Sequence, residues 1–266
     1  MSKEIFGSDA YAPKDIAGRV CEVGMAKARL PLLTLALLGV LAGAFIGLGS
    51  LLYTLVMSDA SLGFAAQRFL GGLVFSLGLV LVVVAGAELF TGNSLIAMGW
   101  ASRCVSTPEL LRNWAVACVA NFVGAAGLAL LVGWSGAMAM NQGAVAQAVV
   151  KIASAKAALP WAEAFFRGVL CNVLVCMAVW MTLAGRSVTD KIVAIVFPIT
   201  AFVAAGFEHS IANMYFFPLA MWLGAPLGWG DMLHNLAPVI AGNIVGGSVL
   251  VALVYWVIYL RRAEPG

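Results

Sequence analysis

Long apolar stretches dominate the chain and are separated by short segments that carry charges, Pro or Gly. A membrane-spanning helix needs about 20 apolar residues, because the hydrocarbon core of a bilayer is about 30 Å thick. Six stretches reach this length, at approximately residues 32–56, 69–100, 110–134, 161–184, 192–223 and 235–260. The pattern therefore predicts an all-α membrane protein with six transmembrane helices.

The second and fifth stretches are longer than a bilayer requires, and polar residues interrupt each of them. The interruptions are Glu88-Leu-Phe-Thr-Gly-Asn93 and Glu208-His-Ser-Ile-Ala-Asn213. We expect both spans to be broken helices. Two half-helices would then expose unsatisfied backbone N–H groups and positive dipole ends where the chain unwinds, which favours an anion at that place.

The two interruptions belong to an internal repeat. Both have the frame Gly-x-Glu-x-x-x-x-Asn, displaced by 120 positions, and Asn-x-Val-Gly recurs at Asn121 and Asn243, displaced by 122 positions. Each half, at about residues 31–134 and 160–260, then holds three spans. Because three is odd, the halves must enter the membrane from opposite sides, which is the inverted-repeat architecture of channels and secondary transporters.

The composition excludes an ordinary water-soluble protein. Of 266 residues, 63% are hydrophobic and 10% are charged, and the mean hydropathy is +1.01. We therefore expect membrane lipid as a partner of the protein. The net charge of +3 is small and the basic residues are scattered, so we expect no binding to nucleic acid. Five cysteines without Cys-x-x-Cys spacing and two histidines make no zinc, haem or nucleotide motif. We therefore expect no metal, no cofactor and no enzymatic activity.

Lys and Arg are distributed unequally between the two sides of the predicted spans. Three lie on one side, namely Arg68, Lys151 and Lys156. Eleven lie on the other side, namely Lys3, Lys14, Arg19, Lys27, Arg29, Arg103, Arg112, Arg186, Lys191, Arg261 and Arg262. The excess of positive charge on cytoplasmic loops predicts that both termini are cytoplasmic and that the protein lies in the cytoplasmic (inner) membrane.

We expect a single channel domain over residues 31–260, between a cytoplasmic segment at residues 1–30 and a tail at residues 261–266. Pro13 can begin a short amphipathic helix in the N-terminal segment. Its apolar face would hold Ile16, Val20 and Val23, and its basic residues, including Lys27, would lie outside that face.

Four stretches together resemble the formate/nitrite transporter family, namely Glu88–Asn93, Gly206–Met214, Asn172–Trp180 and Gly242–Gly247. Within the family, residues 184–191 and 255–261 look most like its formate channels. The resemblance extends over nearly all of the membrane region. It implies an aquaporin-like fold, a homopentamer with one substrate path in each protomer, and transport of formate or a similar small monovalent anion.

The resemblance also implies residue roles. His209 would lie in the middle of the pore, with Thr91 and Asn172 nearby as hydrogen-bonding groups. Two apolar constrictions would flank it, an outer one of Leu79 and Phe202 with Phe75 nearby, and an inner one of Leu89, Phe90 and Val175. An ionisable group within a membrane segment usually lines a pathway, which favours the functional interpretation of His209. Our hypothesis is that formate enters, takes a proton from His209 and crosses the second constriction as formic acid.

The two glutamates, Glu88 and Glu208, are expected to support the structure rather than contact the substrate. Each carboxylate can accept hydrogen bonds from free backbone N–H groups, or from Asn93 and Asn213 respectively. Family analogy gives Lys156 as the nearest counter-ion.

Other functions remain open at this point. Nitrite and hydrosulfide are also small monovalent anions of weak acids. A neutral-solute, aquaporin-like channel would use the same architecture, although the Asn-Pro-Ala motifs of that family are absent. The sequence decides neither between a channel and a proton-coupled carrier, nor the direction of flux, nor whether the N-terminal helix gates the pore at low pH.

Overall fold

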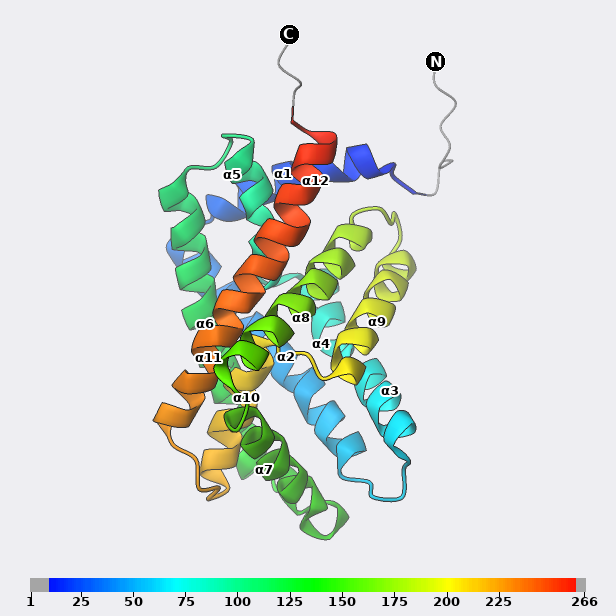
Figure 1. Ribbon diagram of the computed structural model, residues 1–266, viewed down its shortest axis with the longest axis vertical. Coiled ribbons are helices and arrows are strands. Elements are labelled where there is room, and N and C mark those ends of the chain that lie inside the picture. The colour runs from blue at the N-terminus through cyan, green and yellow to red at the C-terminus, as the bar shows by residue number, and fades with distance from the viewer. Residues whose placement is uncertain (1–9, 262–266) are drawn as a thin grey trace.

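A computed structural model describes residues 10–261 as a helical bundle, and both ends of this part of the chain lie at one end of the bundle (Figure 1). Residues 1–9 and 262–266, which include Lys3, Arg262 and most of the predicted tail, lie outside the described residues. Within residues 10–261, the regular structure is helical except for one isolated antiparallel bridge between Ala10 and Gly185.

Six helical segments are long and apolar enough to cross a membrane, which confirms the predicted number of spans. They are α2 (Leu32–Met57), the series α3 (Phe64–Phe75), α4 (Leu77–Val80) and η1 (Leu81–Gly86), α6 (Thr107–Trp134), α8 (Trp161–Thr182), α9 (Val188–Ala205), and the series α11 (Trp229–Ile244), η5 (Val245–Leu253) and α12 (Val254–Tyr259). The last segment begins before the predicted Asn235, because the Asp231 carboxylate accepts a hydrogen bond from Gly228 N–H and starts the helix at Trp229.

The helical backbone stops at both polar motifs. Gly86 ends η1 with φ +89°, and residues 87–91 are not helical before η2 (Gly92–Ile96) and α5 (Ala97–Ala101). Gly206 follows α9 with φ +76°, and α10 (Ser210–Trp222) begins only after residue 209. A left-handed backbone favours glycine, because a Cβ atom would clash there. The opposite insertion of the two halves stays a prediction.

Two further helices precede the first span of each half and lie at opposite ends of the bundle (Figure 1). They are α1 (Pro13–Ala28) and α7 (Ala144–Ala157), the second following the short η3 (Ala137–Ala139) and η4 (Asn141–Gly143). Pro13 begins α1 as predicted, and Ile16 and Val20 are buried, but Val23 is 39% exposed. The buried face is displaced toward Ala17 and Cys21, because α1 packs against η2 and α5.

Close helix crossings position the polar residues of each half. A Cβ atom at Gly124 would overlap the carbonyl oxygen of Val40, so α6 and α2 touch through their backbones. A Cβ atom at Gly242 would likewise overlap the carbonyl oxygen of Phe165, where α11 meets α8. These contacts bring the polar side chains of α6 and α11 within hydrogen-bond distance of neighbouring backbone.

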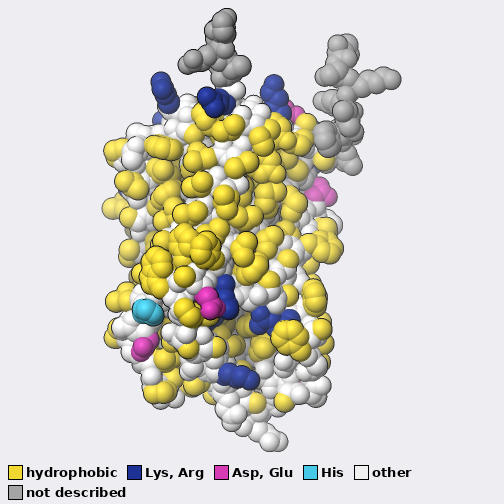
Figure 2. Space-filling model, viewed as in Figure 1, with side chains coloured by type: hydrophobic (Ala, Val, Ile, Leu, Met, Phe, Trp, Pro, Cys, Tyr) yellow, Lys and Arg dark blue, Asp and Glu magenta, His cyan; other side chains and the backbone are white. Residues whose placement is uncertain are grey.

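The visible surface is largely apolar, and Lys and Arg are seen at its upper end and in its lower half, with a broad apolar zone between them (Figure 2). Large apolar side chains such as Leu33, Phe64 and Phe197 are more than two-thirds exposed. A soluble protein rarely exposes such a continuous apolar surface, whereas lipid tails favour it. Together with the six long helices, this surface is that of an integral membrane protein.

Candidate functional site

Four side chains of the second half form a closed polar cluster around Glu208. The carboxylate accepts hydrogen bonds from Lys156 Nζ at 2.9 Å and from Asn213 Nδ2 at 2.7 Å. Asn213 Nδ2 also donates to Asn235 Oδ1 at 2.7 Å, and Asn235 Nδ2 donates to the Lys156 carbonyl at 2.9 Å. Three separate elements, α7, α10 and α11, are thereby tied to the non-helical segment.

The first half repeats each of these bonds and adds one, from Lys27 Nζ to Asn93 Oδ1 at 3.3 Å. Lys27 Nζ donates to Glu88 at 2.6 Å, and Asn93 Nδ2 donates to Glu88 at 2.8 Å and to Asn113 Oδ1 at 2.9 Å. Asn113 Nδ2 then donates to the Lys27 carbonyl at 3.0 Å. Lys27 was expected outside the packed face of α1, and the structure corrects this, because its ammonium group reaches the buried carboxylate of Glu88.

A second pair of asparagines holds the non-helical segments in place. Asn121 Nδ2 donates to the carbonyls of Gly39 and Glu88, at 2.8 and 2.9 Å, and Asn121 Oδ1 accepts from Phe90 N–H at 2.9 Å. Asn243 makes the equivalent bonds to Gly168, Glu208 and Ser210 at 2.8, 3.0 and 3.1 Å. Each buried amide therefore satisfies two backbone groups that a continuous helix would have paired internally, and its third bond ties the segment to a neighbouring helix, α2 at Gly39 or α8 at Gly168.

A cavity of about 660 Å³, called the vestibule below, leads inward from the α7 end of the bundle to His209. Glu208 is the one acidic side chain among its described lining residues, and it is paired with Lys156. The basic lining residues are Arg68, Lys151, Lys156 and Arg167. An excess of positive charge in a concave surface raises the local concentration of anions.

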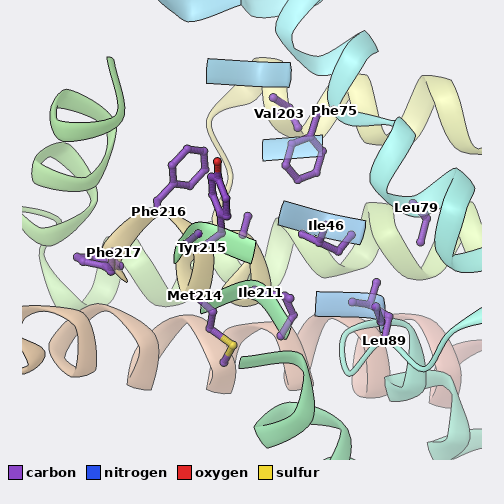
Figure 3. Close-up of a cluster of buried hydrophobic side chains, with 14 of the residues drawn as sticks. Ile46, Phe75, Leu79, Leu89, Val203, Ile211, Met214, Tyr215, Phe216 and Phe217 are labelled. Carbon is purple, nitrogen blue, oxygen red and sulfur yellow. The ribbon is translucent and has the colours of Figure 1, made fainter. Parts of the chain in front are cut away.

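A second, much smaller cavity of about 10 Å³ lies deeper and is called the central cavity below. Such a space is about the size that one water molecule needs. Its lining is Ile46, Phe75, Leu79, Leu89, Val175, Ile199, Phe202 and His209. Figure 3 shows Phe75, Ile46 and Leu89 following one another, with Leu79 to one side. The fold thus brings together His209 and five of the six residues expected at the constrictions.

Phe75, Phe202 and His209 line both cavities and so form the boundary between them. The Phe75 and Phe202 rings meet edge to face at 5.7 Å between centroids. The His209 ring stacks on Phe202 at 5.9 Å, with 19° between the ring planes. His209 is the one titratable side chain among the residues that line the central cavity.

The hydrogen bonds of His209 define its tautomer. Nδ1 accepts from Ala212 N–H at 3.2 Å, which caps the first turn of α10. A neutral ring whose Nδ1 accepts must carry its hydrogen on Nε2, and Nε2 lies 3.1 Å from Thr91 Oγ1. In this arrangement, Nε2–H donates to the Thr91 hydroxyl. Thr91 and His209 are thus brought together from the two halves of the chain.

Asn172 and Phe90 lie close to this site but do not line either cavity. The Asn172 amide donates to the carbonyls of Thr91 and Asn243 at 3.1 and 2.6 Å, and also to Ser94 Oγ at 3.1 Å. Its Oδ1 is buried without a hydrogen-bond partner among the described residues. The amide nitrogen of Asn172 thus supports the non-helical backbone at Thr91, and a role of Asn172 as a hydrogen-bonding group of the pore stays a prediction.

Sequence reasoning did not find Lys27, Asn113 and Asn235 as members of the polar clusters. Asn113 and Asn235 each lie eight positions before the repeated Asn121 and Asn243, and they share the displacement of 122 positions. That spacing could have identified them. Within residues 10–261, no three His, Cys, Asp or Glu side chains gather as potential metal ligands.

Known proteins resemble the chain over almost all of its length. Residues 14–257 match the model of the formate/nitrite transporter family. The chain is 41% identical to a protein named "Probable formate transporter" from Methanothermobacter thermautotrophicus, covering 96% of this chain and 100% of the relative. It is 37% identical to the formate channel FocA of Escherichia coli K12, covering 96% and 97%.

Two solved structures share the fold. One, described as a pentameric formate channel with formate bound, has a TM-score of 0.81 and 37% identity, covering 86% of this chain and 98% of the other. The second, described as an FNT family ion channel, has a TM-score of 0.83 and 32% identity, covering 92% and 98%. By sequence and by structure, the chain belongs to the formate/nitrite transporter family, whose members are channels and transporters.

Proposed function

We propose that the protein is a formate channel of the cytoplasmic membrane, assembled as a homopentamer with both termini in the cytoplasm. Two relatives whose names specify formate, and a pentameric neighbour with formate bound, support the substrate and the assembly. The uneven distribution of Lys and Arg supports the orientation, and it makes the vestibule the extracytoplasmic mouth.

One observation carries the proposal of a path through each protomer. His209 lies at the boundary between a positively charged vestibule and a central cavity whose other lining residues are apolar. A bare carboxylate loses most of its hydration among apolar side chains, whereas the neutral acid loses only the hydration of a hydrogen-bonding group. Formate would therefore accumulate in the vestibule as an anion and cross the apolar part as formic acid.

His209 is the group proposed to exchange the proton, and its hydrogen bonds set a condition on that step. The neutral ring has one hydrogen, on Nε2, and it cannot release that hydrogen to formate without becoming an imidazolate. Proton transfer to formate thus requires the imidazolium form, with a second hydrogen on Nδ1. Because Nδ1 accepts from Ala212 N–H, protonation must break this cap or rotate the ring.

The two apolar constrictions would exclude water and hydrated ions on either side of His209. Phe75, Leu79 and Phe202 would form the one next to the vestibule, and Leu89 and Val175 the one beyond it. Phe90 is buried and lines neither cavity, so we propose a packing role for it. Glu88, Glu208 and the residues bonded to them would hold the two non-helical segments in register.

Uptake of labelled formate by liposomes tests the proposed substrate. Liposomes that contain the purified protein are expected to take up formate much faster than protein-free liposomes and to exclude glycerol. Nitrite uptake measured on the same vesicles ranks the two anions. Formate uptake no faster than in protein-free vesicles, or preferential glycerol uptake, would overturn the proposal.

A further inference from the structure

Arg68 places a guanidinium group in the vestibule without a carboxylate partner. The side chain comes from α3 and is half-buried. Nε donates to the Ala204 carbonyl at 2.8 Å, and Nη1 donates to the Tyr53 hydroxyl at 3.4 Å. Among the described residues, no Asp or Glu oxygen lies within 4.0 Å of it.

Each of the other basic residues of the vestibule either is paired with a carboxylate or is not held in place by hydrogen bonds. Lys156 is neutralised by Glu208 at 2.9 Å, and Arg167 is neutralised by Glu163 at 3.0 Å. Lys151 lines the same cavity but is exposed, and no hydrogen bond to another described side chain or backbone group fixes it. Arg68 therefore combines a fixed position with an uncompensated charge.

The position of Arg68 connects it to the path of the substrate. Gly206 stands at the start of the non-helical segment that ends in His209, and a Cβ atom there would lie 2.6 Å from Arg68 Nη2. The absence of a side chain at Gly206 thus allows the guanidinium to lie against this segment. Both Arg68 and His209 line the vestibule.

The number of free hydrogens on Arg68 indicates what it could bind. A guanidinium has five N–H groups in a planar fork, and two of them are used by Ala204 and Tyr53. The remaining three can bind two oxygen atoms of one planar anion side by side, which a lysine ammonium cannot do with the same geometry.

We propose that Arg68 is the recognition residue of the vestibule, and that it selects planar anions with two oxygen atoms, such as formate and nitrite, over spherical anions. The Tyr53 hydroxyl and the Ala204 carbonyl position its guanidinium. This inference rests on the proposed function and deepens it, because it assigns substrate choice to a site before the first constriction.

A site in front of the constriction acts on binding more than on the passage through it. Loss of the paired hydrogen bonds should therefore raise the formate concentration needed for half-maximal uptake and change the maximal rate little. Hydrogen bonds to a charged group contribute enough that we expect a rise of about tenfold for Arg68→Gln.

The test uses right-side-out membrane vesicles from cells that express the full chain and lack other formate transport. Uptake of labelled formate is measured against formate concentration, and then with nitrite or bromide as competitor. The variants are Arg68→Lys, which keeps the charge, Arg68→Gln, which removes it, and Lys151→Gln as the matched control that removes a mobile charge from the same cavity.

We expect Arg68→Lys to weaken both formate uptake at low concentration and competition by nitrite, roughly fivefold to tenfold, while competition by bromide stays as in the wild type. Lys151→Gln should weaken formate uptake and the competition by nitrite and by bromide to the same extent, and only at low salt. Tyr53→Phe leaves the bond from Arg68 to Ala204 in place. It should weaken formate uptake at low concentration and competition by nitrite, as Arg68→Lys does, but to a smaller extent.

Two results would overturn the inference. The first is an Arg68→Lys channel with the wild-type preference for nitrite over bromide. The second is a Lys151→Gln channel that loses formate uptake and nitrite competition as selectively as Arg68→Lys does. Because Arg68 also caps the end of α9, pentamer assembly and maximal formate uptake are measured for each variant, and a misassembled Arg68→Lys variant leaves Tyr53→Phe to decide. Failure of the wild-type vesicles to take up formate would instead refute the proposed function.

Discussion

Breaking the Lys156–Glu208 ion pair should destabilise the protein more than breaking its counterpart in the first half. Lys156→Met leaves the Glu208 carboxylate, whose side chain is 5% exposed, without a cation. Removing one partner of a buried pair costs about 3–5 kcal/mol, because an uncompensated charge remains. The Lys156 side chain is itself 16% exposed, so we expect a loss near the lower end, about 3 kcal/mol.

The equivalent pair supplies an internal comparison. Lys27 is 29% exposed and Glu88 is 7% exposed, so water can reach that pair more readily, and Lys27→Met should cost about 2 kcal/mol. At about 2–4 °C per kcal/mol, Lys156→Met should lower the unfolding midpoint by about 6–12 °C and Lys27→Met by about 4–8 °C. Tryptophan fluorescence of the purified pentamer during heating in detergent measures both.

A double variant shows how much of the lost stability comes from the missing ion-pair contact and how much from the unpaired buried carboxylate. Lys156→Met with Glu208→Gln leaves no ion in the cluster, and the glutamine oxygen can still accept from Asn213 Nδ2. It should recover at least half of the midpoint lost by Lys156→Met alone. A Lys156→Met protein as stable as the wild type, or a double variant no more stable than the single one, would refute this reasoning.

Two further predictions concern packing and thiol chemistry. Gly124→Ala should cost about 3 kcal/mol and reduce pentamer recovery in size-exclusion chromatography, because its Cβ atom would overlap the Val40 carbonyl. Gly127→Ala, with no atom within 4 Å of its Cβ atom, is the control, and equal recovery of both would contradict the expected crossing. Burial raises the pKa of the Cys21 thiol in α1, so its reactive thiolate forms at higher pH than usual. Maleimide labelling of Cys21, followed by mass spectrometry, should therefore lag behind that of exposed Cys104 at pH 7 and increase on raising the pH, whereas equal labelling would be inconsistent with a buried Cys21.

The membrane spans could be predicted from the sequence because bilayer thickness fixes their length and because charges and polar residues mark their ends. The repeated Glu and Asn positions indicated where the backbone leaves the helix, since an ionisable group within an apolar span needs partners. His209 was identified through the resemblance to the family, and its ionisable ring within an apolar span favoured the same interpretation.

Other features depend on tertiary geometry that periodicity does not set. Lys27 looks like a solvated charge on an amphipathic helix, and only the packing of α1 on η2 brings its ammonium group to Glu88. The side-chain directions of Phe90 and Asn172 are decided by a non-helical segment and its hydrogen bonds. Arg68 is one basic residue among fifteen in the sequence, and its isolation from carboxylates becomes visible only in three dimensions.

Formate accumulation driven by a pH gradient tests the central claim, that His209 exchanges a proton with formate inside the protein. Liposomes with an alkaline interior and the membrane voltage clamped at zero should accumulate labelled formate through the wild-type protein faster than through His209→Asn, which retains a hydrogen-bond donor but cannot titrate. His234→Asn, at an exposed position on α11, is the matched control and should behave as the wild type. Gradient-driven accumulation through His209→Asn at the wild-type rate would contradict the account.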